Sequence, residues 1–599
     1  MAAGVTVTNA QDEFPDQDVA FRRTIVYDVD EKHDTLFALS SQVSTELTIL
    51  SDHRTKVRLL PIHERFFAPI TKLKVKFNRS SVSSDNILYG VDAWSDEFLP
   101  SYKLYTILLP AEPKTDDVVS SSYREQFSDL AFLPIISVPN VDSMIEYRIT
   151  FKHPDDVTVD FELYFPRDSV PYSVHRSDEE TTIDFSNLRY DEPLTFFPEN
   201  YHAAVLCRLK HNQKEINPVS PHEFVAWYHR AANPLVPIDS LQRATFDKHL
   251  AGTSSFADTM KAIYDYVKTN IRYVADERGL NAYIPRAPSS TMASGFGDCK
   301  DRVALVAGIA ACYGIHILTV FVPPPEAPAF NGVHVEMFDH VIGAVEIGSR
   351  LVYFDPTEKY CEFGNLPDHD VGKRVFVFGG ESGRFETIHV PQRNPALDVT
   401  IDADLRFLKD CRAVVVLRND LMQTALHARH DLTNDKFLET LGLEVANNLY
   451  QVRLDSLDVV AERESSLTVS ARADLSRFFV ASGQKFYVPR APFAQFDNDV
   501  LERMGDHAAI VFPSTVDLKL RVAVRGPAVE VLPDSVHLGA GSFVFKATAA
   551  PADSIAVFDF RYTRDSVAIS PEEKGAFINE YRAYLGNKKN VFVIKRRLP

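Results

Sequence analysis

One stretch of sequence decides the fold that we expect, namely Gly295-Phe-Gly-Asp-Cys-Lys-Asp-Arg302. This glycine-rich turn delivers Cys299 to the start of an apolar helical run, Val303 to Tyr313, which Gly314 is suited to end. A thiol at a helix N-terminus faces unpaired N–H groups and the positive end of the helix dipole, and both favour the thiolate. The glycines would let backbone and substrate approach closely. Cys299 is therefore a candidate nucleophile, although a small, inert, buried cysteine at a helix start is the alternative.

A nucleophilic thiol needs a base, and the base needs an orienting group. Two predicted strands supply both, because residues 339–347 carry His340 and residues 350–355 end in Asp355. If either Gly348-Ser349 or Ile347-Gly348 forms a two-residue loop, His340 and Asp355 fall on one face of a hairpin, within about 5–8 Å from Cβ to Cβ. A three-residue loop would instead place the two side chains on opposite faces of the hairpin. A single histidine on a strand is more often a surface residue or a hydrogen-bonded core residue. The presence of Asp355 on the same face of the hairpin favours a catalytic pair.

Metal and phosphate sites are weaker interpretations of the same region. His334, Glu336, Asp339 and His340 are metal-type ligands, but their spacing matches no established zinc pattern. The turn at 295–300 lacks the Walker spacing, and its aspartate would repel phosphate. No acidic loop has the spacing of calcium ligands. We therefore expect no metal and no cofactor.

The five cysteines give no disulfide or zinc framework. They lie far apart, form no CxxC pair, and their odd number leaves at least one free thiol. Four of them lack a setting like that of Cys299 and are expected to be structural thiols: Cys207, Cys312, Cys361 and Cys411.

Residues 1–198 form the first predicted domain. β-forming residues alternate or cluster between Asp, Ser, Pro and Asn, and helical periodicity is scarce. We expect an antiparallel β-sandwich of roughly immunoglobulin-like or larger size. The expected strands include Phe21–Tyr27, Leu73–Phe77, Tyr147–Phe151 and Thr158–Phe165.

Residues 199–396 form the second predicted domain, in which helices come first and strands follow. Ser220 and Ser255 are predicted helix N-caps, because a carboxylate residue lies three positions after each serine and apolar residues follow at helical spacing. This order is typical of an α+β domain. The expected strands are 315–322, 340–347 and 351–354.

Residues 397–599 return to β-patterning and form the third predicted domain. Strands are expected within Ala413–Leu417, Ala508–Phe512 and Phe543–Ala547. A helical insert is predicted over Asp435–Tyr450. A terminal helix, capped at Ser570, is predicted to close near Gly586.

Composition narrows the function classes. The chain has 599 residues, which at roughly 150 residues per domain suggests about four domains, with three large ones also plausible. Hydrophobic residues are 45% and charged residues 24%, which excludes long disorder and fibrous structure.

A net charge of −18 argues against non-specific attraction to nucleic acid or an anionic membrane. The longest apolar stretch, 303–315, is too short to span a bilayer. No signal peptide is visible at the N-terminus, so a complete chain would be cytoplasmic.

Five blocks of this chain, in order and spacing, resemble the transglutaminase-like superfamily. They span about ninety residues: Tyr266–Val274, Gly279…Tyr283-Ile-Pro285, Gly297–Asp301, Phe338–Val341 and Tyr353–Thr357. More closely, they resemble the bacterial branch in which this core lies between two β-rich domains of unknown function. The resemblance implies a multi-domain α+β fold with a papain-like core between two antiparallel β-sandwich domains.

The same resemblance implies an activity. Cys299 would be the nucleophile, His340 the general base and acid, and Asp355 the orienting group. The thiolate would attack an amide carbonyl of a protein or peptide, and an amine or water would resolve the thioester. Relatives of this architecture are usually exported, so an exported or periplasmic location is implied. The alternative is a non-catalytic binding or scaffold protein, with the triad vestigial or blocked by the loops Asp276–Gly297 or Pro323–Phe338. The oligomeric state stays open.

Overall fold

The structure is a computed structural model, and statements on structure refer to the residues that it describes. These are 19–33, 36–50, 59–91, 98–99, 103–139, 143–165, 170–189, 201–232, 238–250, 252–253, 255–324, 327–348, 350–359, 361–367, 370–388, 396–418, 421–422, 425–426, 429, 432–449, 451–463, 466–493, 510–511, 516–525, 529–531, 534–540, 543–552, 555–564, 568–569, 571–587 and 591–596.

The protein is mainly β, with about 52% of residues in strands and 21% in helices. The expected α+β fold, with a papain-like core between two antiparallel β-sandwich domains, is therefore wrong. The two largest sheets are mixed: β1 (Val19–His33) runs parallel to β11 (Ser143–Lys152), and β25 (Leu397–Asp404) runs parallel to β32 (Val516–Arg525). Alternation along a strand determines which face is buried, but it carries no information about the direction of the partner strand.

The chain divides into two compact units. The first comprises Met1–Val352 and Val375–Glu386, and the second comprises Tyr353–Arg374 and Thr387–Pro599. The division into three domains at 1–198, 199–396 and 397–599 stays a prediction.

An eight-stranded sheet of the first unit contains most of the predicted N-terminal strands. Its order is β13-β14-β11-β1-β2-β9-β4-β5. Leu39, Val43 and Leu47 alternate with more exposed residues along β2, so one face of this strand packs into the core. The remaining strands are β2 (Leu36–Ile49), β4 (Ile70–Phe77), β5 (Ser80–Ser81), β9 (Val118–Phe127), β13 (Tyr172–Arg176) and β14 (Glu180–Arg189).

Smaller sheets complete the strands before the helical region. One is β10 (Ile136–Pro139), β15 (Tyr201–His211) and β12 (Val157–Tyr164), with β16 (Lys214–Glu215) paired to β15. Another is β3 (Leu59–Glu64), β8 (Lys103–Leu108) and β6 (Ile87–Val91). Two short parallel pairs join β7 (Phe98–Leu99) to β18 (Ala275–Asp276) and β17 (Arg272–Tyr273) to β19 (Phe296–Gly297).

Local sequence signals determine the helix starts of the first unit. The Ser255 hydroxyl accepts a hydrogen bond from the Asp258 N–H at 3.1 Å, which confirms the predicted N-cap. The Ser220 hydroxyl accepts from the Glu223 N–H at 3.5 Å. The helices are α2 (Pro221–Ala232), α3 (Ser240–His249), α4 (Phe256–Asn270), α5 (Pro288–Ser294) and α6 (Cys299–Ala311).

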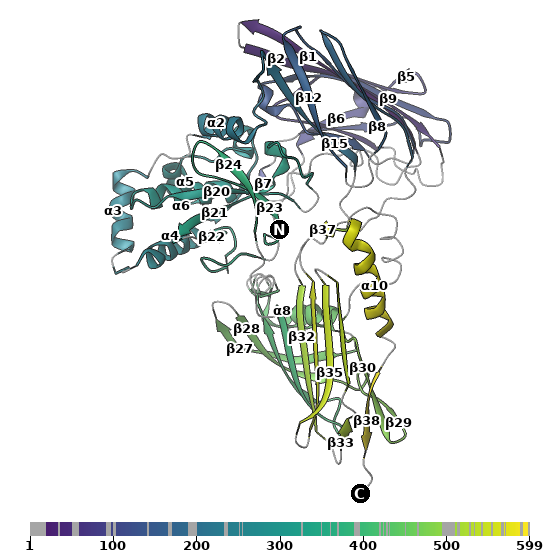
Figure 1. The fold of residues 1–599 in the computed structure, drawn as a ribbon, viewed down its shortest axis with the longest axis vertical. Coiled ribbons are helices and arrows are strands. Elements are labelled where there is room, and N and C mark those ends of the chain that lie inside the picture. The colour runs from purple at the N-terminus through teal and green to yellow at the C-terminus, as the bar shows by residue number, and fades with distance from the viewer. Residues whose placement is uncertain are drawn as a thin grey trace. The chain divides into compact units, whose positions relative to one another are not determined.

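Helix α6 is the central helix of the part that carries the predicted site. It contacts α4, α5 and the strands β20 (Ile317–Val322) and β21 (His340–Ile347), as Figure 1 shows in teal. Almost every α6 residue from Cys299 to Ala310 is buried, including the charged residues 300–302 of the first turn, and the helix is apolar on nearly all sides beyond them. The sheet order is β22-β21-β20-β23-β24, with β22 (Arg350–Phe354), β23 (Arg374–Phe378) and β24 (Gly383–Thr387).

The second unit is built on another eight-stranded sheet, in the order β27-β28-β26-β25-β32-β36-β35-β34 (Figure 1). The predicted strands at 413–417 and 543–547 lie in β26 (Cys411–Leu417) and β35 (Phe543–Ala552). The other strands of this sheet are β27 (Arg453–Arg463), β28 (Ser466–Asp474), β34 (Asp534–Ala540) and β36 (Ile555–Arg564).

Both helices predicted for the second unit are present. The predicted insert is α8 (Asn434–Asn448), and the predicted terminal helix is α10 (Pro571–Asn587). Its expected cap, Ser570, and part of 508–512 lie outside the described residues. The other strands are β29 (Val480–Ser482), β30 (Lys485–Pro489), β31 (Ile510–Val511), β33 (Val529–Val531), β37 (Ala568–Ile569) and β38 (Val591–Arg596).

Candidate active site

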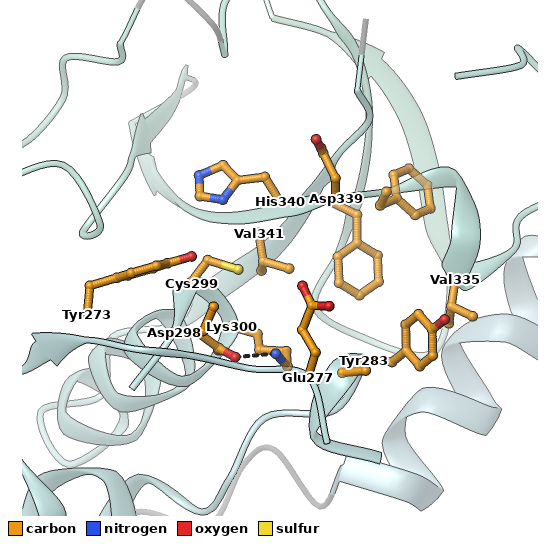
Figure 2. A pocket seen from close by; sticks show the side chains of 14 residues that line it. Tyr273, Glu277, Tyr283, Asp298, Cys299, Lys300, Val335, Asp339, His340 and Val341 are labelled. Atoms are coloured by element: carbon orange, nitrogen blue, oxygen red, sulfur yellow. Dashed lines mark hydrogen bonds and ion pairs between the residues drawn. The ribbon is translucent and has the colours of Figure 1, made fainter. Parts of the chain in front are cut away.

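A pocket in the first unit contains both Cys299 and His340 in its lining (Figure 2). Residues of both loops that were predicted to border a cleft also line it, Tyr283 from the first and Phe338 from the second. The full lining is Tyr273, Ala275, Glu277, Ala282, Tyr283, Asp298, Cys299, Lys300, Phe321, Val335, Phe338, Asp339, His340 and Val341.

Cys299 is the first residue of α6, as the sequence predicts. Asp298 is the N-cap, and its side chain accepts a hydrogen bond from the Asp301 N–H at 3.2 Å. The Cys299 side chain faces the pocket, and the residue is only 8% exposed. The thiol therefore lies at the positive end of the α6 dipole, in a setting largely shielded from water.

The glycines before Cys299 have structural roles that differ from the predicted approach of substrate. Gly295 has a φ of 69° and ends α5 in the left-handed conformation. At Gly297, an added Cβ would lie 2.7 Å from the Cβ of Asp301 and 3.0 Å from Cγ2 of Thr291. Glycine is therefore required there because β19 packs directly against α5 and α6.

Gly297→Ala is expected to destabilise the fold by about 1–3 kcal/mol, because the extra methyl group overlaps Asp301. Chemical denaturation measures this change. Gly380→Ala is the matched control, since an added Cβ there meets nothing within 4 Å. Equal stability of the two variants would contradict the packing argument.

The turn is held by an ion pair that the sequence does not reveal. The Arg286 guanidinium donates to Oδ2 of Asp301 at 2.8 Å and to the Phe296 carbonyl at 2.6 Å, and the Arg286 N–H donates to Oδ1 of Asp301 at 2.8 Å. Asp301 is 2% exposed, so this contact is buried at the helix start. A carboxylate three residues after the N-cap was a usable signal for Asp301, but nothing local indicated Arg286.

Asp298 and Lys300 form a second buried ion pair beside Cys299 (Figure 2). The two residues are 2% and 5% exposed. Burial raises the pKa of the Asp298 carboxyl, and the Lys300 ammonium opposes this shift. Because these two charges compensate each other, the pair contributes little net charge to the pocket.

His340 is the first residue of β21 and pairs with Val322 of β20. It is 5% exposed. Strand β21 ends at Ile347 and β22 begins at Arg350, close to the predicted bounds of these two strands. The structure thus brings together Cys299 and His340, 41 positions apart in sequence, in one pocket.

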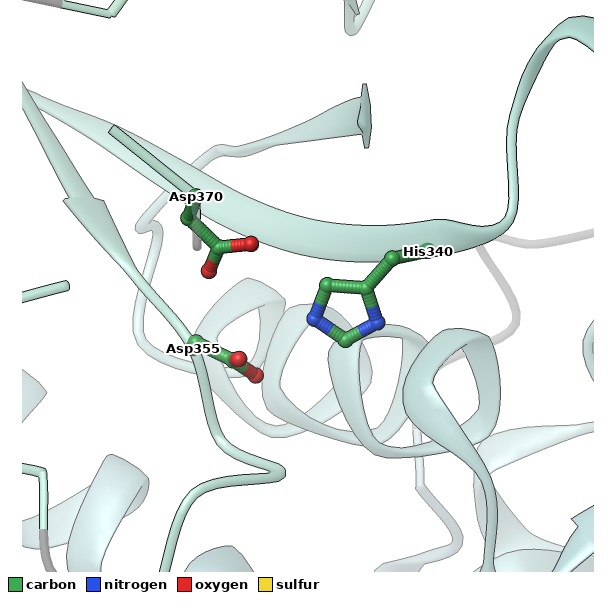
Figure 3. A group of neighbouring side chains, drawn as sticks. All are labelled: His340, Asp355 and Asp370. Carbon is green, nitrogen blue, oxygen red and sulfur yellow. The ribbon is translucent and has the colours of Figure 1, made fainter. Parts of the chain in front are cut away.

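Two carboxyl groups neighbour His340, as Figure 3 shows. One ligand atom from each of His340, Asp355 and Asp370 lies within 4.8 Å of the others, and all three residues are buried. Oδ1 of Asp355 accepts hydrogen bonds from the N–H and hydroxyl of Thr357, at 2.8 and 2.7 Å, which fix the carboxyl orientation. Asp370 was missed, because no periodic signal links it to the predicted hairpin. One imidazole and two carboxylates can also hold a divalent cation, so the expected absence of metal stays a prediction.

Two of the other residues considered as metal ligands, His334 and Glu336, form hydrogen bonds elsewhere. His334 Nε2 lies 3.1 Å from the Ala131 carbonyl, and its Nδ1 accepts from the Glu336 N–H at 3.2 Å. The Glu336 carboxylate accepts from the Ile135 N–H at 3.0 Å. Both residues therefore tie η4 (Val335–Met337) to the preceding β-rich region.

The remaining cysteines behave as structural thiols. Burial raises the pKa of the Cys207 thiol, and burial raises that of Cys411 to about 11. Cys361 is buried, and Cys312, at the C-cap of α6, is half-buried. None of these four lines the pocket of Cys299.

Glu277 is a pocket residue that sequence reasoning missed. It follows β18 and is 7% exposed, and burial raises the pKa of its carboxyl from 4.5 to about 7. The folded protein therefore holds this proton at pH values where the unfolded chain has released it. The contribution of the protonated Glu277 carboxyl to the free energy of unfolding is therefore complete below about pH 4.5 and is lost as the pH rises through 7.

Glu277→Gln is expected to become progressively more stable than the native protein between pH 5 and pH 8, by a difference on the order of 3 kcal/mol at most. Denaturant midpoints across this range measure it. Glu346→Gln, the same change at an exposed position of β21, is the control and should show no such trend. A pH-independent difference for Glu277→Gln would contradict the assigned burial effect.

In the described part of the chain, no helix is long and apolar enough to cross a membrane.

Comparisons with known proteins show a shared fold. No protein-family model and no curated sequence matches this chain. A candidate protease from Parabacteroides distasonis, 10% identical, covers 96% of this chain and 99% of its own, with a TM-score of 0.58. At that identity the likeness establishes the fold alone.

Two further solved structures match only in part. An M1 zinc metallopeptidase from Deinococcus radiodurans, 10% identical, covers 32% of this chain and 42% of its own, with a TM-score of 0.19. A candidate nutrient-binding protein from Legionella pneumophila, 12% identical, covers 47% and 94%, with a TM-score of 0.21. Neither likeness bears on function.

Proposed function

We propose that this protein is a cysteine-dependent amide hydrolase or acyltransferase that acts on protein or peptide amides. The observation that carries the proposal is the common pocket of Cys299, at the start of α6, and His340, at the start of β21. Cys299 is the nucleophile, His340 the general base and acid, and Asp355 the group that orients the imidazole.

The proposed reaction proceeds through a thioester. His340 takes the proton of the Cys299 thiol, and the thiolate attacks the amide carbonyl. The backbone N–H of Cys299, at the start of α6, is placed to donate to the developing oxyanion. His340 then gives its proton to the leaving amine. Water or a second amine attacks the thioester, and His340 accepts and returns a proton in this half of the reaction.

Two comparisons support the proposal without fixing the substrate. The five sequence blocks resemble transglutaminase-like proteins, whose chemistry uses the same three residue types. The candidate protease from Parabacteroides distasonis has the same fold over nearly its full length. Because one fold can carry several chemistries, the reaction has to be decided at the site itself.

One observation favours the alternative, a non-catalytic binding or scaffold protein. Cys299 is 8% and His340 5% exposed, so residues of the bordering loops cover much of the site. A covered triad fits a gated enzyme or a blocked site, and the reactivity of the thiol distinguishes them.

Cys299 is expected to react with iodoacetamide well below about pH 8, and to lose that reactivity on His340→Ala. The imidazole partner and the helix dipole both favour the thiolate. Mass spectrometry of the Cys299 peptide, across a pH series, measures the rate. The Cys312 peptide is the internal reference, and its rate should be the same in both proteins. A Cys299 that reacts only above pH 8, or that ignores the His340 change, would support the scaffold alternative.

Substrate chemistry is tested with a glutamine-containing peptide library, incubated with and without a primary amine. Mass spectrometry distinguishes cleavage, deamidation and amine incorporation. Product formed by the native protein and absent from Cys299→Ala supports the proposal, and no product in any arm counts against it.

A further inference from the structure

Glu277 is a buried carboxyl group that the proposed reaction does not use. Figure 2 shows its side chain extending into the pocket that Cys299 also lines. Within the part of the chain that the structure describes, the Glu277 carboxyl forms no hydrogen bond and no ion pair. Lys300, the lysine in the lining, is already paired with Asp298.

A carboxyl group so placed has a physical preference for one kind of ligand. A buried carboxylate without a partner is costly, and an entering cation removes that cost by pairing with it. An entering anion would meet the Glu277 carboxyl, which lines the pocket. The arrangement therefore favours cationic groups over neutral ones and neutral groups over anionic ones.

The rest of the lining suits an organic cation. Aromatic rings of Tyr273, Tyr283, Phe321 and Phe338 surround the pocket, together with small apolar side chains. Ammonium groups bind well against aromatic faces, and their carbon chains bury favourably against such walls. A strongly hydrated inorganic ion would find few oxygen ligands among these side chains.

We propose that Glu277 is a specificity-determining residue that selects substrates carrying an alkylammonium group close to the reacting carbonyl. This inference rests on the proposed function, because it assumes that Cys299 is the reacting group. The ammonium has two possible sources: the free α-amino group of the peptide that is attacked, or the primary amine that resolves the thioester. In the second case the amine binds as an ammonium and gives one proton to the Glu277 carboxylate before its lone pair attacks the thioester.

Three methanethiosulfonates of different charge test the preference without requiring turnover: the cationic 2-aminoethyl, the neutral methyl and the anionic 2-sulfonatoethyl reagent. In each case the thiolate attacks the sulfenyl sulfur, a disulfide forms, and methanesulfinate leaves. Rates are measured on the Cys299 peptide by mass spectrometry. In the native protein the cationic reagent should react fastest and the anionic one slowest.

Glu277→Gln should lower the ratio of the cationic to the anionic rate by about tenfold or more. Glu277→Asp, which keeps the charge, should retain most of the ratio. Glu346→Gln, an exposed change on β21, should leave it unaltered.

The outcomes separate this inference from the proposed function. Reaction at Cys299 with no charge preference, or a ratio that Glu277→Gln leaves unchanged, overturns the inference and leaves the nucleophile intact. A uniform rate change for all three reagents also overturns it, since Glu277 would then act on the thiol. A Cys299 that none of the reagents modifies overturns both.

Substrate pairs then identify the source of the ammonium. The rates with peptides that have free or acetylated N-termini test whether the acyl donor carries the ammonium. The rate of dansylcadaverine incorporation tests whether the acceptor amine carries it. Glu277→Gln should lower the rate selectively either for free N-termini or for amine incorporation, and either result supports the inference. Unchanged rates in both arms contradict it.

Discussion

Cys299→Ala is expected to lose essentially all amide turnover, by at least about 10⁴-fold, while the protein stays folded. In the proposed reaction the thiol forms the thioester, so no other pocket residue would replace it. The site is a helix start where a small side chain suffices, and the cost to the free energy of unfolding should not exceed roughly 1–2 kcal/mol. Turnover of a peptide substrate, together with a denaturation curve, measures both quantities. Cys299→Ser should behave in the same way.

Cys312→Ser is the matched control for this prediction. Cys312 lies at the other end of α6, where its thiol contacts the Gly308 carbonyl at 3.5 Å, and it does not line the pocket. Its replacement should leave the rate unchanged. A Cys299→Ala protein that keeps most of its activity would refute the nucleophile assignment.

Asp355→Asn is expected to lower the rate by on the order of 10³-fold or more, with little change in structure. The amide keeps the shape and its contacts with Thr357, but it no longer stabilises the imidazolium of His340. Asp355→Ala would add the loss of orientation. Steady-state turnover of a peptide substrate by Asp355→Asn and by the native protein measures the effect.

Asp370→Asn is the informative comparison, since Asp370 is the second carboxyl beside His340. A large loss in Asp370→Asn with a small one in Asp355→Asn would transfer the orienting role to Asp370. A chelator distinguishes the metal alternative. Activity that survives EDTA fits an orienting role, whereas loss that zinc restores would assign the three residues to a cation.

The transglutaminase-like resemblance and the three-domain division stay predictions, whereas the expected fold class was wrong. Strand positions were largely correct, as in β1, β11, β21 and β22. The error came from assembling these strands, because sequence alternation does not specify partners or directions. The parallel pairing of β1 with β11 joins segments more than a hundred residues apart, and no local pattern reports it.

The sequence by itself determined the features that depend on neighbours along the chain. The caps at Ser255 and Asp298 are examples, and so is the position of Cys299 at the first residue of α6. These follow from hydrogen bonds between residues three positions apart, which short motifs encode directly.

Only the tertiary structure decided which groups surround the thiol. Glu277 enters the pocket from the loop after β18, Arg286 reaches Asp301, and Asp370 neighbours His340. Each placement depends on how loops pack against α6 and β21. The sequences of such loops have no periodicity that predicts their structure. Residues distant in sequence surround their side chains and thereby determine the charge state of those side chains.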